Sequence, residues 1–92
     1  MATTSVDQVF TIANGLSVAL KRVPKDQKAA VASRYFSGQF DRVLKEAKRV
    51  APSINKDVWP DSVGTKAVKY VELEGLIGGI EELLRSLIEF TQ

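Results

Sequence analysis

The strongest constraint on the fold is the stretch LEGLIGGIEELLRSLIEF, residues 73–90, in which large apolar residues recur at three- and four-residue steps. This spacing predicts an amphipathic α-helix. On a helical wheel the apolar residues fill an arc of about 160°, which is wider than the stripe of a helix lying on one neighbour. We therefore expect this helix to be the centre of a bundle or to pack across a subunit interface.

The same helix contains three interior glycines, Gly75, Gly78 and Gly79. Each costs a helix about 0.5–1 kcal/mol relative to alanine. Gly75, Gly79 and Ser86 share one flank of the apolar arc, where small residues let another backbone approach closely. One interpretation is a kink at Gly78–Gly79 that lets the helix follow the bundle. The other is a close contact with a partner or a second copy.

Two earlier segments also have helical periodicity. Residues 5–23 open with a capping box, Ser5-Val6-Asp7-Gln8, and stop before Pro24. Residues 39–50 carry one apolar stripe, formed by Phe40, Val43, Leu44, Ala47 and Val50. Between them, a further helix is expected to start at Pro24 and close at Gly38, unless residues 25–50 form one long helix.

Residues 52–65 hold two of the three prolines and the only tryptophan, and they are expected to form a well-packed connector. Trp59 is interpreted as a plug at the open end of the bundle, with an interface anchor as the alternative. Residues 66–72 fit a helix or a short strand. The whole chain, 1–92, is thus predicted to be one all-α domain, a bundle of four or five helices with mostly antiparallel neighbours.

Composition argues against most kinds of catalytic chemistry. The chain has no cysteine and no histidine, which are the usual thiolate nucleophiles, general bases and transition-metal ligands. Glu81 and Glu82 are adjacent, so they point about 100° apart on a helix and do not form a carboxylate pair. The segment GLIGG lacks the lysine and serine or threonine of a phosphate-binding loop. We expect no enzyme activity, no cofactor and no metal site.

The first residues carry no positive region followed by an apolar run, which argues against a signal peptide. No apolar run approaches the roughly 20 residues of a membrane span. The polar face of residues 73–90 is acidic, which is the wrong sign for anionic lipid. The expected compartment is the cytoplasm, without membrane contact.

Charge is distributed unevenly along the chain. Residues 1–50 contain nine basic and four acidic residues, a net charge of +5, whereas residues 70–92 contain one and five, a net charge of −4. The two halves either neutralise each other within the fold or face different partners. Two pairs at four-residue spacing, Asp41–Lys45 and Arg42–Glu46, are placed to meet on the helix surface.

These observations lead to two functional hypotheses. The first is a non-catalytic protein–protein interaction module, a regulator or adaptor, expected to be a homodimer and to bind a partner that the sequence does not identify. Its predicted contact residues are Leu76, Gly79, Leu83, Ser86 and Phe90. The alternative is a nucleic-acid-binding regulator, because residues 31–50 have a helix–turn–helix outline. Its predicted binding residues are Arg42, Lys45, Lys48 and Arg49.

Overall fold

The computed structural model describes residues 5–91, with side chains as far as residue 89. This part of the chain forms three α-helices, α1 (Val6–Lys21), α2 (Arg34–Val50) and α3 (Tyr70–Thr91). Two single-turn 3-10 helices, η1 (Lys25–Gln27) and η2 (Lys56–Val58), lie in the connections. The all-α class is confirmed, since the described residues contain one isolated bridge, Val31–Lys69, and no strand. The predicted count of four or five helices is wrong.

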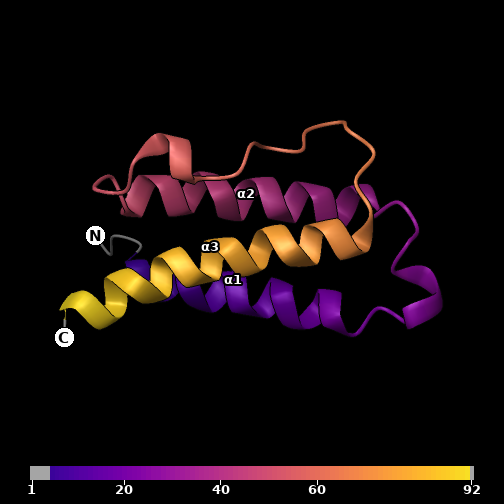
Figure 1. The fold of residues 1–92 in the computed structure, drawn as a ribbon, viewed down its shortest axis with the longest axis horizontal. Coiled ribbons are helices and arrows are strands. Elements are labelled where there is room, and N and C mark those ends of the chain that lie inside the picture. The colour runs from indigo at the N-terminus through magenta and orange to yellow at the C-terminus, as the bar shows by residue number, and fades with distance from the viewer. Residues whose placement is uncertain (1–4, 92) are drawn as a thin grey trace.

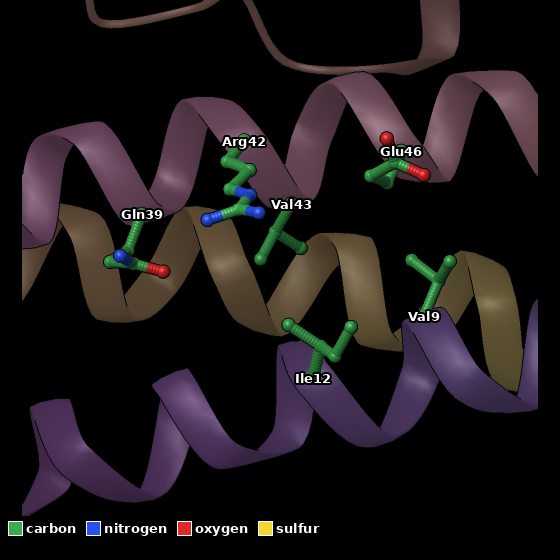
Figure 2. Close-up of a pocket in the computed structure, with 6 residues that line it drawn as sticks. All are labelled: Val9, Ile12, Gln39, Arg42, Val43 and Glu46. Atoms are coloured by element: carbon green, nitrogen blue, oxygen red, sulfur yellow. The ribbon is translucent and has the colours of Figure 1, made fainter. Parts of the chain in front are cut away.

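The three helices lie side by side along the long axis of the molecule (Figure 1). α1 runs antiparallel to both α2 and α3, so α2 and α3 run parallel to each other. Their parallel direction requires the long connection of residues 51–69, which returns along α2 (Figure 1). Figure 2 views the face on which α1 and α2 lie in front and α3 lies behind them. α1 packs more extensively against α3 than against α2.

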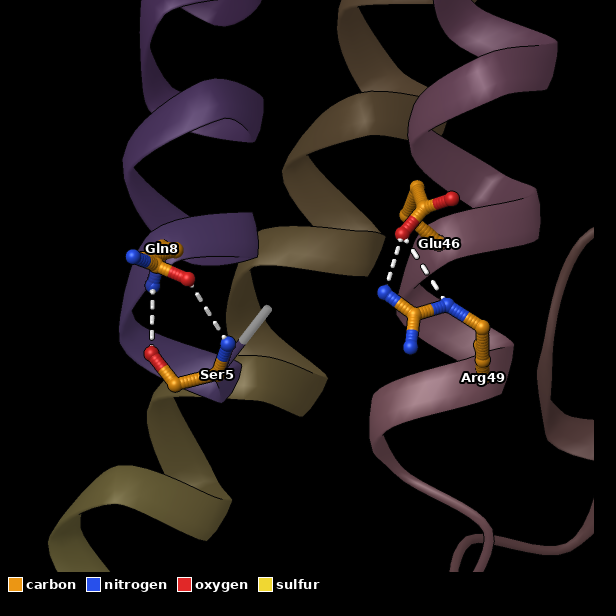
Figure 3. Close-up of polar contacts among 4 residues, drawn as sticks. All are labelled: Ser5, Gln8, Glu46 and Arg49. Atoms are coloured by element: carbon orange, nitrogen blue, oxygen red, sulfur yellow. Dashed lines mark hydrogen bonds and ion pairs between the residues drawn. The ribbon is translucent and has the colours of Figure 1, made fainter. Parts of the chain in front are cut away.

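Local sequence signals explain α1. The predicted capping box is confirmed: the Gln8 backbone N–H donates to Ser5 Oγ at 3.2 Å, and the Ser5 N–H donates to Gln8 Oε1 at 2.9 Å (Figure 3). These two bonds satisfy N–H groups that have no partner within the helix. α1 ends at Lys21, ahead of Pro24. Its predicted stripe is buried, with Val9, Ala13, Leu16 and Leu20 in the core.

The helix predicted from Pro24 to Gly38 is not formed. α2 begins only at Arg34, after the N-cap Ser33, and it continues without a break through Gly38. Residues 28–30 form turns and a bend and Val31 pairs with Lys69, because the backbone of this segment bonds to the start of α3. The N–H groups of Tyr70 and Val71 donate to the carbonyl oxygens of Ala30 and Lys28 at 3.1 and 3.0 Å. This segment therefore caps the N-terminus of α3.

Residues 51–69 connect α2 to α3, and the predicted connector within them, residues 52–65, contributes buried side chains to the core. Trp59 is 6% exposed and lies in the core with Val63. Asp41 of α2 holds the connector: its two carboxylate oxygens accept from the Val63 and Gly64 N–H groups, both at 2.8 Å. Gly64 has a φ of +52°, a left-handed conformation that glycine adopts without strain. The stretch 66–69 is not helical, since α3 starts at Tyr70.

α3 supplies the centre of the core. Four residues from the middle of its apolar arc have no exposed surface: Leu73, Ile77, Ile80 and Leu84. The helix is continuous through Gly78 and Gly79. The residues on the flank of the arc pack against the core only in part. The wide arc thus combines a central core stripe with a partly exposed edge.

Candidate protein interface

The predicted contact residues of α3 lie along that partly exposed edge. Leu76 and Leu83 are half-buried and touch the core, whereas Gly79 and Ser86 are exposed. Phe90 belongs to α3, but its side chain lies outside the part of the chain that the structure describes. The structure therefore brings Leu76, Gly79 and Leu83 together on one surface, with Ser86 one turn further along the helix.

These residues line an open hollow of about 360 Å³ between α3 and the connector, which we call the α3 groove. Its apolar wall on the connector side consists of Val58, which is 54% exposed, and Pro60. Glu82 is the charged residue at its rim. The groove is lined by Val58, Pro60, Gly75, Leu76, Gly79, Glu82 and Leu83. The two connector residues were not predicted, because only the fold brings them to α3.

The glycines of α3 are not required by packing within the chain. A β-carbon built on Gly75, Gly78 or Gly79 has no atom within 4 Å beyond its own helix neighbours. An alanine would fit each site and would favour the helix. A close approach from inside the described chain therefore does not explain these residues. Gly75 and Gly79 line the α3 groove, so the open space beside them belongs to that hollow.

The alternative site on α2 is exposed. Arg42, Lys45, Lys48 and Arg49 all lie on the surface. Arg49 is bound to Glu46, with Nη2 2.6 Å from Glu46 Oε2 (Figure 3). Neither of the ion pairs predicted at four-residue spacing, Asp41–Lys45 and Arg42–Glu46, is formed. Glu46 instead binds Arg49, and Asp41 accepts a hydrogen bond from the backbone of the connector. Within residues 5–89, Arg42, Lys45 and Lys48 make no ion pair.

The helix–turn–helix outline of residues 31–50 is wrong. Its proposed turn, Ser37-Gly38, lies inside the continuous α2. No second helix precedes it within the segment, because Val31 pairs with Lys69 in an isolated bridge. The basic residues of α2 thus belong to the middle and end of a helix packed along the bundle. They do not form a short recognition helix set at an angle to another.

A second hollow, of about 390 Å³, lies between α1 and α2 (Figure 2). Ile12 of α1 and Val43 of α2 point toward each other across it, and the Arg42 guanidinium lies between Gln39 and Val43 (Figure 2). A neighbouring hollow shares Ile12, Gln39 and Val43 and extends to Gly15 and Tyr35. We call the two together the α1–α2 groove.

The sequence interpretation missed the α1–α2 groove. The signal that marks it is a second apolar row on α1, in which Ile12, Gly15 and Ala19 follow at three- and four-residue steps beside the buried stripe. This second row makes the apolar face of α1 wider than its buried stripe. The apolar face of α3 is widened in the same way by the residues on the flank of its arc. Ile12 is 52% exposed in consequence.

No group of three acidic residues within the described chain is arranged to hold a metal ion. None of the helices in the described residues has the length and apolar run needed to cross a membrane.

Comparisons with protein-family models, curated proteins and solved structures find no match to this chain.

Proposed function

We propose that this protein is a non-catalytic interaction module that self-associates through the α3 groove. The observation that carries the proposal is the open apolar hollow beside α3, which no part of the described chain fills. Leu76 and Leu83 expose part of their surface there, and Val58 exposes more than half of its own. Covering apolar surface is the main favourable contribution to protein association.

The glycines support a helical occupant. Gly75 and Gly79 are one turn apart on the wall of the groove, with open space where a β-carbon would lie. A second helix can therefore come close to the α3 backbone. A second copy of the chain is the simplest source of such a helix, and a homodimer is the stoichiometry that the sequence predicts.

Sedimentation velocity over a wide range of protein concentration tests the proposal. Wild-type chain is expected to form species heavier than the monomer. Val58→Glu and Leu83→Glu place a charge in the groove and are expected to give folded monomers. Val31→Glu is the matched control, since Val31 is 57% exposed and lines neither groove. Wild-type protein that remains monomeric throughout the range contradicts the proposal.

Leu83 also touches the core, so Leu83→Glu alone does not separate an interface from a packing defect. Val58→Glu resolves this ambiguity, because Val58 is largely exposed and its replacement leaves the core intact. Far-UV circular dichroism confirms the fold of each variant. A folded Val58→Glu that assembles like wild type argues against contact at the α3 groove.

Nucleic-acid binding is retained as a second candidate because Arg42, Lys45 and Lys48 are exposed and unpaired within the described residues. Such cations bind phosphates by releasing counterions, which makes affinity fall steeply with salt. Fluorescence anisotropy with a mixed-sequence DNA duplex measures this at low and physiological salt. Salt-dependent binding that is lost in Arg42→Ala/Lys45→Ala/Lys48→Ala would favour this candidate.

A further inference from the structure

The α1–α2 groove has the shape and the exposed apolar residues of a docking surface. Ile12 and Tyr35, which are 52% and 68% exposed, stand at its sides, and Val43 lies at its base. Gly15 lies in the wall contributed by α1, and a β-carbon there would meet no atom within 4 Å. The backbone of α1 is thus open to close approach, as is that of α3.

The rim of this groove is positively charged. Arg42 lies in the wall and makes no ion pair among the described residues. The acidic residue beside it, Glu46, is already bound to Arg49. α2 as a whole carries five basic and two acidic residues, and one of those two, Asp41, is held by the connector. An acidic helix is therefore the complementary occupant.

The chain itself contains such a helix. α3 carries five glutamates and one arginine. Glu82, whose side chain is 75% exposed, stands at the rim of the α3 groove beside Leu76 and Leu83 and forms an ion pair with Arg85 at 3.4 Å. An exposed pair of this kind contributes little to stability, so Glu82 can exchange it for a partner across an interface. An apolar edge with an acidic rim on α3 thus matches an apolar groove with a basic rim between α1 and α2.

We propose that the α3 face of one copy docks into the α1–α2 groove of a second copy, so that the chain assembles head to tail. Leu76 and Leu83 cover Ile12 of the neighbouring copy, and Glu82 is the acidic partner of its Arg42. This inference rests on the proposed self-association and specifies which two surfaces meet.

Two observations favour this pairing over contact between two α3 helices. Two α3 grooves facing each other would bring two copies of Glu82 together, and like charges across an interface oppose association. The α1–α2 groove also lies on the face of the bundle opposite α3 (Figure 2). In the proposed arrangement each copy uses its α1–α2 groove on one neighbour and its α3 face on another. Each contact leaves one free groove and one free α3 face, so assembly continues beyond the dimer.

Mixing two blocked variants tests the head-to-tail arrangement. Ile12→Glu blocks the α1–α2 groove, and Val58→Glu blocks the α3 face; both residues are more than half exposed, so the fold is kept. Each variant alone is expected to be monomeric by sedimentation velocity. An equimolar mixture is expected to give a complex of one copy each, because one variant retains the α3 face and the other retains the groove. Wild-type chain grows past the dimer as concentration rises.

Two other outcomes distinguish a failure of the head-to-tail inference from a failure of the proposed self-association. If Ile12→Glu assembles like wild type while Val58→Glu is monomeric, two α3 faces meet each other, and only the head-to-tail inference is overturned. Wild-type chain that stays monomeric overturns both proposals and leaves the grooves to helices of other proteins.

A charge exchange tests the pairing of Arg42 with Glu82. Arg42→Glu is expected to weaken assembly about tenfold or more, as close charge pairs do when one partner is reversed. Glu82→Arg in the same chain is expected to restore it, because every contact then carries the reversed pair. Lys48→Glu is the control, since Lys48 lines neither groove. Failure of the exchange to restore assembly contradicts this pairing.

Discussion

Asp41 fixes the connector to α2 through both oxygens of its carboxylate. The bonds from the Val63 and Gly64 N–H groups are 2.8 Å long, a distance typical of hydrogen bonds to a charged acceptor. Both donors lie at the turn where the chain passes through the left-handed Gly64. The residue therefore determines where the connector lies against the bundle.

Asp41→Ala should lower the free energy of unfolding by about 1–3 kcal/mol, because two bonds to a charged acceptor are lost and the exposed Gly64 N–H regains water. Asp41→Asn keeps one acceptor oxygen and should lose less. Urea unfolding followed by circular dichroism measures both. Asp61→Ala is the control from the same connector, since no bond of the Asp61 side chain is present in the described structure. Equal stability of Asp41→Ala and wild type would contradict this role.

Trp59 makes a separate prediction about the core. Its side chain is 6% exposed and belongs to the buried core cluster, to which all three helices contribute residues. Trp59→Ala should lower stability by about 3–5 kcal/mol, since it removes a large buried ring and leaves a cavity. The melting temperature should fall by about 12 °C or more.

Val31→Ala is the control for Trp59→Ala, because Val31 is 57% exposed and lines neither groove. Its melting temperature should stay close to that of wild type. A Trp59→Ala protein that keeps its melting temperature and loses self-association would instead make Trp59 an interface anchor.

At the scale of the elements, the glycines of α3 distinguish an internal role from an external one. Gly79 lines the α3 groove and Gly78 does not, yet an added β-carbon meets open space at both. Gly79→Ala and Gly78→Ala should each raise the stability of the isolated fold by about 0.5–1 kcal/mol. Only Gly79→Ala should weaken self-association, because its methyl group occupies the contact surface.

Sedimentation equilibrium of the two alanine variants beside wild type measures this difference, and thermal unfolding at low protein concentration measures the stability gain. Equal assembly of Gly78→Ala and Gly79→Ala would show that the α3 backbone is not approached closely. A loss of stability in both would mean that the helix needs glycine at these positions for a reason inside the fold.

The sequence predicts those elements whose signals are local. α1 was located correctly because its capping box and Pro24 lie within a few residues of its ends. The segment from Pro24 to Ser33 was not, because its irregular path depends on bonds to Tyr70 and Val71, some forty residues later. The alanines of this segment favour a helix, but its carbonyl oxygens instead accept hydrogen bonds from the N–H groups at the start of α3.

The candidate site likewise combines residues placed by local helical periodicity with residues placed by the path of a distant segment. The wheel of residues 73–90 identified the edge formed by Leu76, Gly79 and Leu83, since helical periodicity alone places them together. It did not identify Val58, which joins the groove only through the path of the connector. Nor did it show that Glu46 pairs with Arg49 and leaves Arg42 without an ion pair among the described residues, because several i, i+3 and i, i+4 partners compete on one helix face.

At the scale of the whole molecule, a chain this small has few ways to cover all its apolar surface. The described residues span 40 × 26 × 23 Å, and three helices leave grooves on both faces of the bundle. A domain of this size buries only about 60–65% of its unfolded surface. Association is a direct means of covering what remains, and its effect on stability is measurable.

Self-association should make the melting temperature depend on protein concentration. A partner that binds only the folded chain stabilises it by up to about 1.4 kcal/mol for each tenfold rise in concentration above the dissociation constant. For a domain of this size, that gain raises the melting temperature by several degrees. Differential scanning calorimetry over a hundredfold range of concentration measures the effect. Val58→Glu should melt at one temperature throughout, because it cannot use the α3 face. If wild type and Val58→Glu both melt independently of concentration, folding and association are not linked, and the α3 groove has another occupant.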